Sequence, residues 1–100
     1  PGTVRKFPRV PAMKVPQMGW NTITPSEHPL FTDIADGTFV YFVHSYYADT
    51  TPEATIASTE YIVPYASAVA CGNALGVQFH PEKSGPAGLA ILRNFVAMTE

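Results

Sequence analysis

The sequence predicts an α/β domain that is rich in strands and ends in a single helix. Runs of β-branched and aromatic residues recur along the chain, at residues 18–24, 38–48 and 54–61. The pair Gly72-Asn73 separates two further apolar runs, which is typical of a hairpin. Only residues 86–98 repeat their apolar side chains with a helical period.

Length and composition limit the chain to one domain. One hundred residues, of which 46% are apolar, suffice for one small core, and we treat residues 1–100 as a single partial domain. Only 14% of residues are charged, against about 25% in an average soluble domain, which indicates that part of the surface is normally covered. The net charge of −2 argues against a nucleic-acid partner. No run approaches the ~20 apolar residues of a membrane span, so no membrane partner is expected.

The first elements are short. Residues 1–17 are rich in proline and are expected to be extended or looped, because proline fixes φ and removes an amide donor. Residues 18–24 alternate in polarity and predict a short strand. Residues 26–34 predict a short helical turn with Ser26 as its cap.

The next element is the strongest strand of the sequence. Asp36-Gly37 predicts a turn, and residues 38–48 that follow it are β-branched or aromatic almost throughout. Their apolar residues fall on both faces, which predicts a strand buried on both sides. Residues 54–61 form another predicted strand.

The last third predicts a hairpin and a helix. Residues 67–80 form the hairpin, with its turn at Gly72-Asn73. Ser84 is expected to cap the helix over residues 86–98, with Pro86 in its first turn. The helix carries an apolar stripe made of Leu89, Leu92 and Val96, widened by Ile91 and Phe95.

His80 and Glu82 are the strongest candidates for chemistry. They stand two residues apart where an apolar run ends, and side chains two apart on an extended segment point to the same side. Pro81 is expected to hold the turn between them and to prevent a helix there. A carboxylate beside an imidazole fixes the ring tautomer, which is the base-and-orienter half of a nucleophilic triad. The alternative is an ordinary surface His–Glu pair.

The stretch "GVQFHPEKS", followed by a helix, resembles the histidine–glutamate signature of class I glutamine amidotransferases. The resemblance implies the C-terminal portion of a flavodoxin-like glutaminase domain. In that family a cysteine attacks the side-chain amide of glutamine. By resemblance, His80 activates the cysteine and Glu82 orients His80, and no cofactor or metal is implied.

Further motifs resemble one branch of the class, the glutaminase subunit of imidazole glycerol phosphate synthase in histidine biosynthesis. They are "VPQMGWN" (15–21), "FVHSYYA" (42–48), "ASTEY" (57–61) and "CGNALGVQFHPEKSG" (71–85). The order of these motifs matches over nearly the whole chain. The branch commonly has a histidine where this chain has Gln17, a departure that touches no catalytic role.

The same resemblance implies further site residues and a partner. His44, Ser45 and Tyr46 match the segment that lines the glutamine pocket. Trp20, Tyr41 and Lys83 match positions at the contact with the cyclase (synthase) subunit. Without the resemblance, core packing is an equally good explanation of the two aromatic residues.

Cys71 is the only cysteine, so no internal disulfide forms and a reducing cytoplasm fits best. It stands beside the hairpin turn, and a strand rising about 3.3 Å per residue places it roughly 20 Å from His80. A nucleophile needs hydrogen-bond reach to its base, so Cys71 is expected to be a partly buried structural thiol instead.

Nothing before residue 15 resembles the nucleophile elbow or the oxyanion loop of the family. We therefore expect the C-terminal half of a glutaminase domain, without glutaminase activity by itself. Sheet edges and apolar faces left open favour self-association.

Three alternatives stay open. The same fold could act as a non-catalytic interaction module, which the coding sequence before Pro1 would distinguish. Another class I amidotransferase is a weaker rival, because "MGWN" and "FVHSYY" argue against it. A metal site of His28, His44 and His80 is the least favoured, since their spacing matches no usual ligand pattern.

Overall fold

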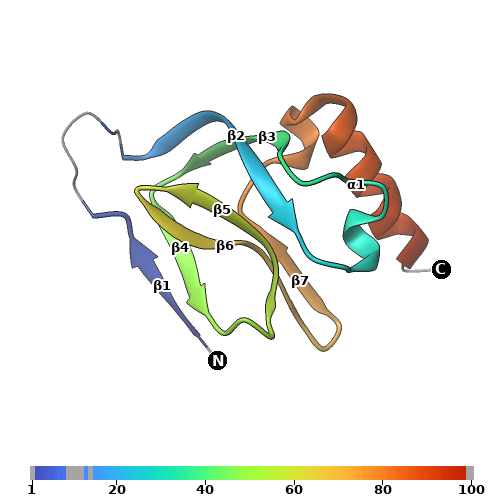
Figure 1. Cartoon of the computed structure of the whole chain (residues 1–100), viewed down its shortest axis with the longest axis horizontal. Coiled ribbons are helices and arrows are strands. Elements are labelled where there is room, and N and C mark those ends of the chain that lie inside the picture. Colours follow the sequence, from blue (N-terminus) through green and yellow to red (C-terminus); the bar gives the residue numbers. More distant parts are fainter. Residues whose placement is uncertain (1, 9–12, 14, 99–100) are drawn as a thin grey trace.

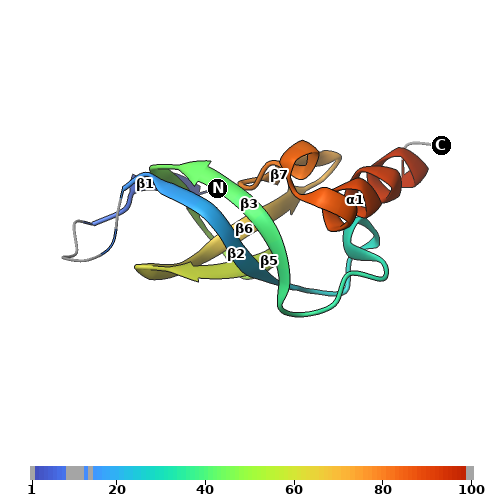
Figure 2. The same cartoon turned by 90° about the horizontal axis from the view of Figure 1, so that it is seen from above.

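The structure is a computed structural model that describes residues 2–8, 13 and 15–98. Strands fill most of the molecule, and α1 lies at one end beside η1 (Figures 1 and 2). The elements are β1 (Gly2–Lys6), β2 (Gln17–Pro25), η1 (Pro29–Phe31), β3 (Thr38–His44), β4 (Tyr46–Thr50), β5 (Thr55–Tyr61), β6 (Val63–Cys71), β7 (Ala74–Val77), η2 (Pro81–Lys83) and α1 (Gly85–Met98). The prediction of a strand-rich domain with one C-terminal helix is confirmed.

The strands form one sheet in the order β1-β4-β6-β5-β2-β3, and β7 pairs with β6 off this path. The strand pairs of the described residues are antiparallel. β1 falls within the proline-rich segment that was expected to be extended. The two hydrogen-bonded neighbours β2 and β3 place Trp20 opposite Tyr41 and Gln17 opposite His44.

The predicted strand over residues 38–48 breaks at Ser45 into β3 and β4. β3 pairs with β2, whereas β4 pairs with β1 and β6. The prediction that this run is buried on both sides is wrong. Val40 and Phe42 are fully buried, but Phe39 of the same strand is 58% exposed. β3 therefore has one core face and one open face.

The hairpin predicted over residues 67–80 is confirmed as β6 and β7. Its strands close with Cys71 opposite Ala74, and Gly72 adopts a φ of +59°, which glycine reaches without strain. β6 begins earlier than predicted, at Val63. The turn from β5 into β6 is made at Ile62, whose φ is +65°. Pro64 lies within β6 and is exposed, a residue that normally argues against a strand.

The helical turn predicted over residues 26–34 is present as η1, but its cap differs from the prediction. His28 caps it, because its Nδ1 accepts a hydrogen bond from the Leu30 amide at 3.1 Å. The Ser26 hydroxyl instead donates to the Ile56 carbonyl at 3.1 Å, and so ties the turn to β5. An imidazole replaces the expected hydroxyl at this cap.

Helix α1 begins and ends within one residue of its prediction. Gly88 and Ile91 are its buried residues. The predicted stripe is mostly uncovered, since Leu89, Leu92, Phe95 and Val96 are exposed. Ser84 does not cap the helix as expected, because its hydroxyl bonds to residues that precede α1.

The core gathers side chains from the sheet, η1 and α1. Its buried apolar members are Phe7, Ile23, Leu30, Phe31, Val40, Phe42, Ile56, Ala57, Tyr65, Ala68, Phe79 and Ile91. Phe42 lies at its centre and packs edge-on against Tyr65 and Phe79, with ring centroids 6.4 and 6.1 Å away. None of the helices formed by the described residues is long and apolar enough to cross a membrane.

Candidate active site

His80 and Glu82 follow β7 and are in contact. The His80 Nδ1 lies 3.0 Å from the Glu82 Oε2. The expected contact is therefore present, although it arises differently from the prediction. His80 is extended, but Pro81 opens the 3-10 turn η2 instead of preventing one. Proline suits the first position of such a turn, because its fixed φ fits and no amide donor is needed there.

The hydrogen bond between the two side chains fixes the ring tautomer of His80. The backbone amide of Glu82 and, to a smaller extent, the His80 side chain donate hydrogen bonds to the Glu82 carboxylate. Both lower the pKa of Glu82, so it is a carboxylate near neutral pH. A carboxylate only accepts, so Nδ1 of His80 carries the donated proton. In the neutral ring Nε2 is then the acceptor, which is the nitrogen that a base needs.

The His44–Ser45–Tyr46 segment lies at the break between β3 and β4. His44 Nδ1 donates to the Tyr46 carbonyl at 2.7 Å, and the Ser45 carbonyl accepts from the Phe7 amide at 3.0 Å. His44 Nε2 lies 2.8 Å from Gln17 Oε1 and 3.0 Å from the Tyr65 hydroxyl. The side chain of His44 is thus held by its own chain, and it fixes the bend of the segment.

Gln17 and Tyr65 complete this buried polar cluster and were not predicted as site residues. The Tyr65 hydroxyl donates to Gln17 Oε1 at 2.8 Å, and both side chains are buried. Burial raises the pKa of Tyr65, so the phenol keeps its proton. Gln17 therefore supports the segment expected to line the glutamine pocket. Its only signal in the sequence is the difference from the histidine that the resemblance implies at this position.

Burial lowers the pKa of His44 below its ordinary 6.5. The folded chain resists protonation there, whereas the unfolded chain takes up the proton as pH falls through about 6.5. We therefore expect the free energy of unfolding to keep its full value above that pH and to fall below it. Urea unfolding at pH 7.5 and 5.5 should show a smaller decline for His44→Asn than for the unchanged chain. Equal declines would contradict this origin.

The three residues expected at a subunit contact lie around the same turn. Trp20 and Tyr41 pack edge-to-face, with ring centroids 5.9 Å apart. Trp20 is 55% exposed, so core packing does not explain it. The Tyr41 carbonyl also accepts a hydrogen bond from the His80 amide at 2.9 Å. Lys83 is exposed on η2. This group, called the Trp20 surface below, adjoins the His80–Glu82 pair.

Cys71 lies at the tip of the β6–β7 hairpin, whereas His80 follows the other end of β7. The expectation that its thiol is partly buried is wrong, because Cys71 is exposed. Cys71 ends β6 and pairs with Ala74 across the turn residues Gly72 and Asn73. Cys71 thus lies on a hairpin and not at a strand-to-helix elbow.

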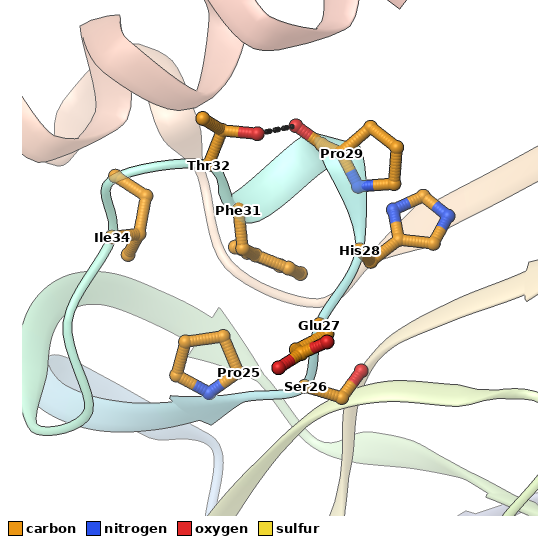
Figure 3. Close-up of a pocket in the computed structure, with 8 residues that line it drawn as sticks. All are labelled: Pro25, Ser26, Glu27, His28, Pro29, Phe31, Thr32 and Ile34. Carbon is orange, nitrogen blue, oxygen red and sulfur yellow. Dashed lines mark hydrogen bonds between the residues drawn. The ribbon is translucent and has the colours of Figure 1, made fainter.

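A hollow of about 540 Å³ between the end of β2 and η1 contains none of the predicted site residues. Figure 3 shows the eight side chains that line it. Its polar groups serve the local turn: His28 caps η1, Thr32 Oγ1 donates to the Pro29 carbonyl, and Ser26 donates to Ile56. The hollow is formed by the turn around η1, and neither His80 nor Glu82 lines it. Within the described ranges no three His, Cys, Asp or Glu residues gather as a metal site requires.

Comparison with known proteins identifies close relatives. The chain is 60% identical to subunit HisH of imidazole glycerol phosphate synthase from Methanosarcina mazei, over 97% of this chain and 49% of that protein. It is 52% identical to the subunit of the same name from Chloroflexus aurantiacus and 48% identical to that from Lacticaseibacillus casei. In both, the match covers all of this chain, and it covers 49% and 48% of the two relatives.

The chain spans about half the length of the curated relatives it matches. A family model described as glutamine amidotransferase class-I matches residues 3–99, which include the His80–Glu82 pair. The match covers nearly the whole chain, as the earlier resemblance did. By this match, the chain belongs to the class I glutamine amidotransferase family.

Proposed function

We propose that this chain contributes the base and its orienter to a glutaminase subunit of imidazole glycerol phosphate synthase. That subunit would hydrolyse glutamine to glutamate and pass the ammonia to a cyclase partner in the cytoplasm. The observation that carries the proposal is the 3.0 Å contact of His80 Nδ1 with Glu82 Oε2, in a chain 60% identical to a HisH subunit.

The chemistry follows from the tautomer of His80. Nε2 accepts the proton of a cysteine thiol, and Glu82 stabilises the imidazolium that results. The thiolate attacks the side-chain amide carbon of glutamine, and the new C–S bond gives a tetrahedral intermediate. His80 then protonates the amide nitrogen as the C–N bond breaks, which releases ammonia. Water hydrolyses the thioester with His80 again as base, yielding glutamate and the free thiol.

The glutamine pocket would include Ser45 and Tyr46, with His44 as the residue that holds them. His44 Nδ1 donates to the Tyr46 carbonyl across Ser45, so its side chain serves the shape of the segment. Ser45 and Tyr46 stand at the break between β3 and β4, and the exposed Tyr46 side chain is open to a ligand there. Ser45 and Tyr46 would thus contact glutamine, whereas His44 would hold them in place.

The cysteine must come from another chain or segment, because Cys71 is the only one in this sequence and lies at the hairpin tip. We therefore expect the purified chain to release no glutamate from glutamine. A coupled glutamate assay over hours at high chain concentration checks this. Glutamate release that disappears on His80→Ala would contradict it, since the chain would then hold its own nucleophile. If such release were measured, Cys71→Ser would show whether the Cys71 thiol is that nucleophile.

The Trp20 surface would contact the cyclase subunit. Exposed aromatic residues are frequent anchors at such contacts, whereas lysines are depleted there, so Trp20 and Tyr41 carry this assignment. Trp20 is the only tryptophan of the chain, so its fluorescence reports docking directly. We expect a blue shift of its emission when the cyclase subunit is added, because the exposed indole loses water.

The energetic part of this prediction uses Trp20→Ala. It should weaken the affinity for the cyclase subunit about tenfold or more, as anchoring tryptophans commonly do. Phe95→Ala on α1 is the control, because it removes another exposed aromatic, 44% against 55% for Trp20, that lies outside the Trp20 surface. Calorimetric titration measures both. Equal losses in the two variants would count against a specific role for Trp20.

A further inference from the structure

We propose that Ser84 is a positioning residue that locks the His80 backbone onto β3. The inference rests on the proposed function, because it concerns the base of that reaction. The Ser84 hydroxyl donates to the His80 carbonyl at 2.6 Å and accepts from the Tyr41 amide at 3.0 Å. It is 2% exposed. One buried hydroxyl thus joins the base to the neighbouring strand.

The link is doubled by the backbone. The His80 amide donates to the Tyr41 carbonyl at 2.9 Å, while the Tyr41 amide is bound by Ser84. Both polar groups of the Tyr41 peptide are therefore occupied by residues 80–84. A ring of three hydrogen bonds closes through Tyr41, Ser84 and His80, and it fixes the base relative to β3.

The attachment of His80 to β3 matters for the chemistry because β3 continues into the segment proposed to bind glutamine. Three residues beyond Tyr41 lies His44, which holds the segment proposed to bind glutamine. The base is hydrogen-bonded to β3, and the segment proposed to bind glutamine follows the end of the same strand. An error of about 1 Å between reacting groups costs roughly a hundredfold in rate, so a fixed reference has a direct catalytic effect.

A helix cap does not explain the hydroxyl. A capping serine accepts from amides one turn ahead, in the helix itself. Ser84 accepts from β3 and donates backwards to His80. Only its carbonyl serves α1, by accepting from the Gly88 amide at 3.3 Å. The hydroxyl is therefore directed at the base.

The first test reads His80 itself in the whole chain, with ¹⁵N-labelled histidine and NMR. In the unchanged chain, the ring nitrogens should report one tautomer, with the proton on Nδ1. Ser84→Ala should give a mixture of both tautomers, because the contact with Glu82 is no longer held. Ser67→Ala is the matched control: Ser67 is fully buried, and its hydroxyl accepts from Thr59 Oγ1 at 2.9 Å. It should leave the His80 signals unchanged.

Two outcomes would overturn the proposal. One is an unchanged His80 tautomer in folded Ser84→Ala, and the other is an equal change in Ser67→Ala. If Ser84→Ala does not fold, hydrogen exchange of the unchanged chain decides. The Tyr41 amide must then be protected from exchange, and rapid exchange there would overturn the proposal. These readings need no activity, so they stand apart from a failure of the proposed function.

The second test is kinetic and uses the glutaminase assembled with its nucleophile-bearing part. Ser84→Ala should lower kcat about a hundredfold and leave KM for glutamine unchanged, because only the base is displaced. Ser67→Ala should change neither. A rise in KM with kcat unchanged would show that Ser84 acts on substrate binding, and would contradict the assignment.

Discussion

Replacing Phe42 with alanine is expected to lower the free energy of unfolding by about 3–5 kcal/mol. The ring is fully buried on β3, where it packs against His44, Tyr65 and Phe79. Its loss leaves a cavity at the centre of the core. It also removes a neighbour of His44, so the bend at Ser45 should loosen. Urea unfolding followed by circular dichroism measures the change.

Phe39→Ala is the matched control for Phe42→Ala. It removes the same side chain from the same strand, but on the open face, where Phe39 is 58% exposed. The expected loss is within about 0.5 kcal/mol, as for most surface substitutions. Similar losses for the two variants would show that β3 is covered on both faces in solution, and would contradict the one-sided core.

Gly88→Ala is expected to destabilise the chain by about 1–3 kcal/mol. In an open helix the same change stabilises by up to about 1 kcal/mol, so even the sign is diagnostic. A Cβ at position 88 would stand 1.9 Å from the Pro81 carbonyl oxygen and 2.8 Å from the Ser84 Cβ. Either α1 or the turn that carries Glu82 must move. Differential scanning calorimetry measures the loss.

Gly76→Ala provides the control, because the added Cβ would meet only the Val69 side chain, at an ordinary 3.4 Å. Its effect should be clearly smaller than that of Gly88→Ala. The tautomer of His80 offers a second reading, since displacement of η2 by Gly88→Ala should disturb its contact with Glu82. A Gly88→Ala chain more stable than the unchanged chain would show that α1 does not approach η2 this closely.

The elements that the sequence predicted well are those with local signals. The β6–β7 hairpin follows from the positive φ that Gly72 supplies, and α1 from its apolar period. The break at Ser45 has no such signal. Residues 38–48 are uniformly suited to strands, and they separate because β4 pairs with β1 and β6 while β3 pairs with β2. Pairing between distant segments decides this boundary.

The same limit applies to the faces of α1 and β3. The sequence shows which residues are apolar, but not which of them find a covering neighbour. Ile91 is buried, whereas Leu89 and Phe95 of the same stripe are exposed. On β3, Phe42 and Phe39 are chemically identical and have opposite environments. Only the arrangement of the other elements distinguishes them.

The candidate site divides in a similar way. The contact of His80 with Glu82 follows from their spacing, although the turn between them is helical and not extended. The duties of Gln17 and Ser84 depend on partners far away in the sequence. Gln17 meets Tyr65, and Ser84 meets Tyr41, so neither could be assigned from a local pattern.

The most direct test of the account is reconstitution of glutaminase activity around His80. The chain is combined with the part of the Methanosarcina mazei HisH subunit that it does not match, and size-exclusion chromatography isolates the complex. We predict that the complex releases glutamate from glutamine, and that His80→Ala lowers kcat about 10³-fold. An isolated complex whose activity is the same with His80→Ala as without it would contradict the assignment of His80 as the base.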